Sequence, residues 1–248
     1  MVARKRKRKY KILVVGNSKC GKTSIINRYV RNNFTDDYKY TIGCDYSQKE
    51  VQDPKTGDAI RLQLWDIAGQ DRFIQMNRPF FRNAVGCIVV CDVARKASID
   101  AACLWKAELE KCLNPGKIGY RVPVILIANK VDTLMDVQES FVIGAYVQRT
   151  ALKMNFDGWF IGSAKNNEKI PEAIEFLLGK ITQEQNKRVL VADSGGGSVL
   201  EIHSKRERVS STKLSQMTNL IHLSRRAPND AEIHGDKDGQ DGRVCVIT

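Results

Sequence analysis

A phosphate-binding loop is the first pattern in the chain with clear chemistry. Residues 16–23 read GNSKCGKT and satisfy GxxxxGK[ST], between a short apolar run and a helical pattern. In such a loop glycines let backbone N–H groups close around phosphates, Lys22 reaches the β- and γ-phosphates, and Thr23 offers its hydroxyl to Mg²⁺. We therefore predict a nucleotide triphosphate as ligand and Mg²⁺ as cofactor. The expected nucleotide contacts in this loop are Gly16, Asn17, Ser18, Lys19, Cys20, Gly21, Lys22, Thr23 and Ser24.

A second motif selects the base. Asn129, Lys130 and Asp132 form NKxD directly after the apolar run at residues 122–128. The carboxylate can accept hydrogen bonds from the ring N–H and the exocyclic amine of guanine, whereas adenine offers no matching pair of donors. An unpaired charged acceptor disfavours the wrong base by roughly 10⁴-fold or more in such sites. A third base-binding element, for which a simple strand-end turn is the alternative, is the SAK motif of Ser163, Ala164 and Lys165.

Two motifs between these lie where a third phosphate would be sensed. They are Thr41 in YTIG and the segment DIAGQ at residues 66–70. With them, residues 10–185 resemble the Ras-like GTPases. The resemblance implies that Thr41 ligates Mg²⁺ and touches the γ-phosphate, and that Asp66 holds the metal's shell through water. It also implies that the Gly69 backbone senses the γ-phosphate and that Gln70 orients the attacking water.

The same resemblance implies a cycle of GTP binding and slow hydrolysis to GDP. Phe34 falls where the family stacks an aromatic ring on guanine, and Tyr38 is a further expected nucleotide contact. The implied metal-binding residues are Thr23, Thr41 and Asp66. By family precedent, neither YTIG nor DIAGQ places an arginine that could act as an arginine finger within the chain itself. Intrinsic hydrolysis should therefore be slow, and a partner is expected to accelerate it. The loops around Thr41 and Gln70 would be ordered by GTP and released on hydrolysis.

Within that family, TIGCDY, LWDIAGQDRF and RPFFRNAVG look most like the Rab branch. Tyr46, Trp65 and Phe80 fall where Rabs carry an effector-contacting aromatic triad, although its usual order is Phe, Trp, Tyr; simple packing against the sheet is the alternative. Two features resemble those of a Rab subgroup associated with lysosome-related organelles. They are Ile67, where most Rabs have Thr, and the lengthened turn at 53–58. The implied function is a regulator of vesicle-mediated membrane traffic that recruits effectors when GTP-bound. An exchange factor and a GTPase-activating protein are the other implied partners.

The carboxyl end of the chain departs from the usual Rab pattern of paired cysteines. It reads CVIT, a CaaX motif that implies one prenyl group on Cys245 and leaves farnesyl or geranylgeranyl undecided. We therefore expect the cytoplasmic face of an intracellular membrane as the site of action, with a cytosolic pool.

Short apolar runs alternate with helical patterns along the first three quarters of the chain, which indicates an α/β fold with a parallel sheet. The resemblance implies a P-loop GTPase domain with a mostly parallel six-stranded sheet, one antiparallel edge strand and helices on both faces. The sequence DPKTGD at 53–58 predicts a hairpin turn between two antiparallel edge strands. We expect a basic arm at 1–9, the GTPase domain at 10–188 and a flexible hypervariable tail at 189–248. The expected strands are 12–15, 62–65, 85–91, 122–128 and 159–161, and the expected helices are 22–31, 97–112, 138–153 and 168–185.

Charge and composition narrow the alternatives. Seven positive charges of the net +12 lie within residues 4–11, so a basic arm describes the chain better than a basic groove. Such an arm suits a lipid headgroup, RNA, a nuclear signal or simply solvent. The seven cysteines lack paired CxxC spacing, which favours a reducing cytosolic compartment. We expect a monomer without a nucleic-acid partner.

Three other classes compete with this interpretation. A nuclear transport-type GTPase would explain the basic run but would not need Cys245. A scaffold locked on GTP is disfavoured by the presence of Gln70 and Thr41. A P-loop small-molecule kinase is contradicted by NKxD, which such enzymes do not use to hold a base.

Overall fold

A single six-stranded sheet organises the chain in the computed structural model, which describes residues 8–193 except 38, 54–56, 70–74 and 115–120. The strand order is β2-β3-β1-β4-β5-β6, and every neighbouring pair is parallel except β2 and β3. The predicted sheet with one antiparallel edge strand is therefore confirmed. The strands are β1 (Arg8–Val15), β2 (Cys44–Gln52), β3 (Ala59–Ile67), β4 (Gly86–Asp92), β5 (Val124–Asn129) and β6 (Gly158–Ile161).

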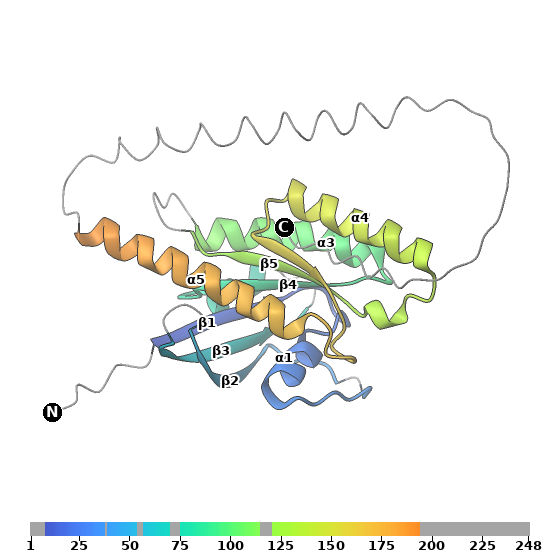
Figure 1. Ribbon diagram of the computed structural model, residues 1–248, viewed down its shortest axis with the longest axis horizontal. Helices are drawn as coiled ribbons and strands as arrows, with labels where there is room; N and C mark the ends of the chain where they lie inside the picture. Colours follow the sequence, from blue (N-terminus) through green and yellow to red (C-terminus); the bar gives the residue numbers. More distant parts are fainter. Residues whose placement is uncertain (1–7, 38, 54–56, 70–74, 115–120, 194–248) are drawn as a thin grey trace, which may run out of the picture. The chain divides into compact units, whose positions relative to one another are not determined.

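Helices cover both faces of this sheet (Figure 1). One core lies beneath α1 and α5, and a second lies beneath α3 and α4 with the short α2 at its margin. β4 is buried along its whole length because it has helices on both sides, which explains why its sequence is continuously apolar. The helices are α1 (Lys22–Arg31), α2 (Arg78–Phe81), α3 (Lys96–Leu113), η2 (Val131–Thr133), α4 (Val137–Lys153) and α5 (Ile170–Asp193).

The ends of several elements differ from the sequence expectation. α5 continues to Asp193, past its predicted end at residue 185 and into the predicted tail, because residues 186–192 contain neither proline nor glycine. β1 begins at Arg8 because this residue pairs with β3 in register, and its guanidinium lies 3.9 Å from Asp53 and 3.8 Å from Asp58. α2 and η2 were missed, since helices of four and three residues show no usable periodicity.

Parallel strands bring chemically useful residues to one edge of the sheet. Gly16 follows β1, Asp66 lies near the end of β3, and Asn129 ends β5. The carboxyl ends of parallel strands are where open α/β sheets bind ligands. Within the part of the chain that the structure describes, no helix combines the length and apolar character needed to span a membrane.

Candidate nucleotide-binding site

The phosphate loop joins β1 to α1, and its glycines are required by close packing. A Cβ on Gly16 would lie 2.1 Å from the Val90 carbonyl oxygen, and Gly16 has a φ of 137°. A Cβ on Gly21 would lie 2.2 Å from Asn129 Nδ2, again at positive φ. Side chains are excluded at both positions, so the backbone itself faces the space in front of the sheet.

The lysine of the loop is held close to the segment predicted to sense the γ-phosphate. Lys22 is buried, and its Nζ donates to the Asn17 carbonyl at 3.0 Å. A Cβ on Gly69 would lie 2.5 Å from Lys22 Nζ, so the two groups share one small space. Ser18 Oγ donates to the Gly69 carbonyl at 2.7 Å, which attaches this segment to the phosphate loop.

The three predicted metal-binding residues converge. Thr23 Oγ1 donates to Asp66 Oδ2 at 2.5 Å, and Thr41 Oγ1 lies 3.2 Å from both of those oxygens. The Asp66 carboxylate is buried at the end of β3, and among the described residues its Oδ1 has no hydrogen-bond partner. Burial raises the pKa of Asp66 above its ordinary value because it disfavours the charged form, despite the hydrogen bond from Thr23.

This donor set fits Mg²⁺. It contains two hydroxyl oxygens and one carboxylate with an unpaired buried oxygen, and a cation there would offset the cost of burying the Asp66 charge. No group of three or more His, Cys, Asp or Glu side chains suited to a metal occurs in the described residues. Magnesium commonly binds through one or two carboxylates completed by phosphates and water, so a single carboxylate is the expected arrangement.

The motifs predicted to bind guanine form one connected network. Asn129 Nδ2 donates to the Cys20 carbonyl at 3.0 Å, while the Ala164 N–H donates to Asn129 Oδ1 at 2.9 Å. The Ser163 hydroxyl donates to the Asp132 carboxylate. The NKxD and SAK segments and the phosphate loop are thus bonded to one another.

A connection that the sequence did not predict involves Asp92 at the end of β4. Its Oδ2 accepts from Lys130 Nζ at 2.7 Å and from Arg95 Nε at 3.0 Å. Arg95 Nη2 also donates to the Ser18 carbonyl at 3.0 Å. Asp92 therefore links the base-binding and phosphate-binding loops. The only sequence signal was an acidic residue at the carboxyl end of a buried strand.

The predicted aromatic residues are placed in two groups. Phe34 is partly buried and packs against the core under α1 and α5. Tyr46 and Trp65 meet edge to face, with ring centroids 5.7 Å apart, and Lys11 Nζ lies 3.9 Å from the Trp65 centroid. Trp65 and Phe80 both pack against the other core. Predictions for Tyr38, Gln70 and Cys245 lie outside the described residues.

Fold and site together define a guanine-nucleotide-binding domain of the Ras-like type. The Ras family profile matches residues 11–183. Ras-related protein Rab-32A of Dictyostelium discoideum is 44% identical over 181 residues, covering 72% of this chain and 80% of that protein. Ras-related protein Rab-32 of Homo sapiens is 42% identical over 173 residues (69% and 74%), and Ras-related protein Rab-7L1 of Rattus norvegicus is 34% identical over 190 (77% and 90%).

The chain belongs to the Ras family, in its Rab branch. It is a small GTPase that hydrolyses GTP and regulates membrane traffic, and Rab GTPases act on intracellular membranes. Such GTPases work with a guanine nucleotide, an exchange factor, an activating protein and effectors.

Proposed function

We propose that this protein is a Mg²⁺-dependent switch whose nucleotide state is sensed where Thr41 and Gly69 meet the phosphate loop. The observation that carries the proposal is the convergence of Thr23, Thr41 and Asp66, three residues far apart in sequence, within 3.2 Å of one another. Thr41 belongs to the loop before β2, and among the described residues its hydroxyl lies 3.2 Å from Thr23 Oγ1 of the phosphate loop. A contact of that kind can be made or lost with one phosphate.

Each part of the site has its own task in this proposal. Asp132 and Asn129 hold guanine, Lys22 neutralises the β- and γ-phosphates, and the phosphate-loop backbone donates to their oxygens. Mg²⁺, when bound, supplies additional neutralisation of the charge that develops between those phosphates. The Gly69 N–H is assigned to the γ-phosphate because its backbone lies beside Lys22 Nζ.

Hydrolysis is assigned to Gln70, which follows Gly69 directly and lies outside the described residues. Its amide would orient the attacking water, and the intrinsic rate is expected on the order of 10⁻⁴ to 10⁻³ per second without a partner. Gln70→Leu should lower the single-turnover rate about tenfold or more while GTP affinity changes little. Rapid-quench measurement of GTP cleavage tests this, and an unaltered rate would remove Gln70 from the mechanism.

Effector recognition is assigned to the aromatic surface of Tyr46, Trp65 and Phe80. Tyr46 is 42% exposed, and its ring packs edge to face with Trp65, so it can contact a partner while it is supported from the sheet. Aromatic rings of this kind supply contact area at low entropic cost. Tyr46 and Trp65 lie on β2 and β3. Thr41, in the loop before β2, and Gly69, in the loop after β3, are the residues expected to respond to GTP.

Membrane attachment is assigned to a prenyl group on Cys245 assisted by the N-terminal basic residues. One lipid chain gives marginal and reversible binding, which fits the cytoplasmic face of a membrane in exchange with a cytosolic pool. Between residues 230 and 244 five acidic residues outnumber two basic ones, so this stretch cannot supply the second signal. Each basic residue near an anionic leaflet contributes about 1 kcal/mol. Cys245→Ser should release the protein to the soluble fraction of cells.

The structure refines which basic residues to test. Arg8 already faces Asp53 and Asp58, and Lys11 lies over Trp65 with a pKa lowered by burial. Replacing residues 4–7 with glutamine should weaken binding of the prenylated protein to anionic vesicles and flatten its salt dependence. A matched control replaces four exposed basic residues of α3 and α4, namely Lys96, Lys111, Arg149 and Lys153. Equal loss in both variants would show a general charge effect and overturn the assignment.

A further inference from the structure

Arg28 connects α1 to the loop that carries SAK. Its Nε donates to the Ala164 carbonyl at 2.8 Å, and its Nη2 donates to the Lys165 carbonyl at 2.8 Å. The third nitrogen, Nη1, donates to the carbonyl of Asn32 at 3.1 Å and to its side-chain oxygen at 3.3 Å. Asn32 ends α1 at a φ of 51°. One guanidinium therefore fixes both the end of its own helix and two successive carbonyls of a distant loop.

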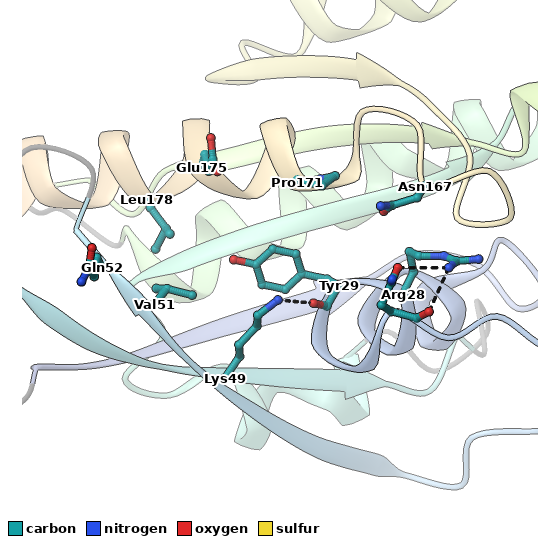
Figure 2. Close-up of a pocket in the computed structure, with 10 residues that line it drawn as sticks. Arg28, Tyr29, Lys49, Val51, Gln52, Asn167, Pro171, Glu175 and Leu178 are labelled. Atoms are coloured by element: carbon teal, nitrogen blue, oxygen red, sulfur yellow. Dashed lines mark hydrogen bonds between the residues drawn. The ribbon is translucent and has the colours of Figure 1, made fainter. Parts of the chain in front are cut away.

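Arg28 reaches this loop from α1. It lines a cavity of about 570 Å³ between α1, β2 and α5, whose other walls include Tyr29, Val51 and Leu178 (Figure 2). Figure 2 shows Arg28 at one end of this cavity. Its Nη1 bonds to Asn32, which also lines the cavity. Its nitrogens reach only backbone and amide oxygens in these contacts. The residue is thus placed to support the loop, and none of these bonds is to a predicted guanine-binding side chain.

The supported loop holds the residue that selects guanine. Ser163 directly precedes Ala164, and its hydroxyl donates to the Asp132 carboxylate. The N–H of Ala164, whose carbonyl Arg28 holds, donates to Asn129. Fixing the carbonyls of residues 164 and 165 therefore restricts both side chains that face the base. The Arg28 guanidinium also lies 6.0 Å from the ring of Phe34, the predicted stacking residue.

We propose that Arg28 is a positioning residue for guanine recognition, acting through the SAK loop on Asp132. The proposal deepens the function assigned above and rests on it. Hydrogen bonds to a charged donor contribute more than neutral ones, and a planar guanidinium can serve two carbonyls that an ammonium cannot serve together. Loss of Arg28 should leave the phosphate contacts in place and loosen the base contacts.

The test compares the release rates of two fluorescently labelled nucleotides, GDP and inosine diphosphate. Inosine diphosphate lacks the exocyclic amine from which Asp132 would accept a hydrogen bond. Arg28→Ala should speed GDP release about tenfold, since 1.4 kcal/mol corresponds to that factor, and should lower the preference for GDP over inosine diphosphate at least about threefold. Arg28→Lys should fall between Arg28→Ala and the unmodified protein. Arg31→Ala is the matched control, because Arg31 lies one turn further on and donates to Asn27 within α1.

The outcomes separate positioning from simple stabilisation. If Arg28→Ala or Arg28→Lys lowers the melting temperature while the preference between the two diphosphates is unchanged, Arg28 is structural and the proposal is wrong. The same conclusion follows if Arg31→Ala alters the preference equally. If the unmodified protein itself fails to prefer GDP over both inosine diphosphate and ADP, the proposed guanine site fails, independently of Arg28. Where Arg28→Ala does not fold, Arg28→Lys decides between the first two outcomes.

Discussion

The side of this site predicted to bind the base and the side predicted to sense the γ-phosphate are built in different ways. On the base side, Asn129 is 2% exposed and Ser163 is fully buried, and each is bonded to residues of other loops. On the sensing side, Thr41 stands between Tyr40 and Ile42, two residues that are 71% and 92% exposed. Its hydroxyl contacts are those to Thr23 and Asp66.

This difference in burial suggests different tasks for the two sides: the base side would supply nucleotide affinity, and the loop around Thr41 would report which nucleotide is bound. A base site that is already assembled loses little entropy when guanine binds, so it can supply affinity in both nucleotide states. A sensing loop with few buried contacts can be ordered or released by one phosphate, because little other packing opposes the change. The buried and bonded residues thus lie where the ligand is expected to be constant, and the more exposed segment lies where it is expected to change.

The largest effect is expected from a change on the base side. Asp132→Asn should lower GTP affinity on the order of 10³-fold or more and raise affinity for xanthosine triphosphate. The amide can donate to the carbonyl that xanthine carries in place of the guanine amine, whereas the carboxylate cannot. Competition binding with ATP, GTP and xanthosine triphosphate measures this, and Ser163→Ala is a milder control that keeps the carboxylate. Equal ATP and GTP affinity in the unmodified protein would contradict the assembled base site.

The residues of this comparison differ in how far the sequence could predict them. Chemistry fixes the residue types of the phosphate loop, NKxD and SAK at set offsets, so Lys22, Asp132 and Ser163 could be identified without coordinates. The alternation of apolar runs and helical patterns likewise predicted the α/β sheet. By contrast, Arg28 bonds to residues 136 and 137 positions away, and such a contact leaves no local pattern. The same holds for Trp105, whose indole N–H donates to Asn17 Oδ1 at 3.0 Å across 88 positions.

The second-largest effect is expected from a change at Thr23, whose hydroxyl contacts both Asp66 and Thr41 on the sensing side. Thr23→Asn should weaken Mg²⁺-dependent GTP binding about 10²-fold, because it removes the hydroxyl that meets both Asp66 and Thr41. GDP binding should suffer less, since the contact with Thr41 serves the third phosphate. Titration of nucleotide affinity against Mg²⁺ measures the change. The preference for GDP over inosine diphosphate should stay as in the unmodified protein, and a loss of that preference would show that the two sides are not separable.

The smallest effect should come from Ser18, where one neutral hydrogen bond joins the phosphate loop to Gly69. Its Oγ donates to the Gly69 carbonyl at 2.7 Å, while its backbone carbonyl accepts from Arg95. Ser18→Ala removes only the first of these bonds. A neutral bond in a partly exposed position contributes about 0.5–1.5 kcal/mol, so the arrangement that places Gly69 beside Lys22 should be disfavoured about twofold to twelvefold.

That loss should appear in the ratio of GTP to GDP affinity rather than in either affinity alone, because only the γ-phosphate requires Gly69 to stay in place. Ser18→Thr retains the hydroxyl and serves as the control, with a ratio close to that of the unmodified protein. Isothermal titration of both nucleotides at saturating Mg²⁺ gives the ratio directly. If Ser18→Ala lowers both affinities equally, the hydroxyl supports the phosphate loop as a whole. Sensing would then depend on Thr41 and its two oxygen neighbours alone.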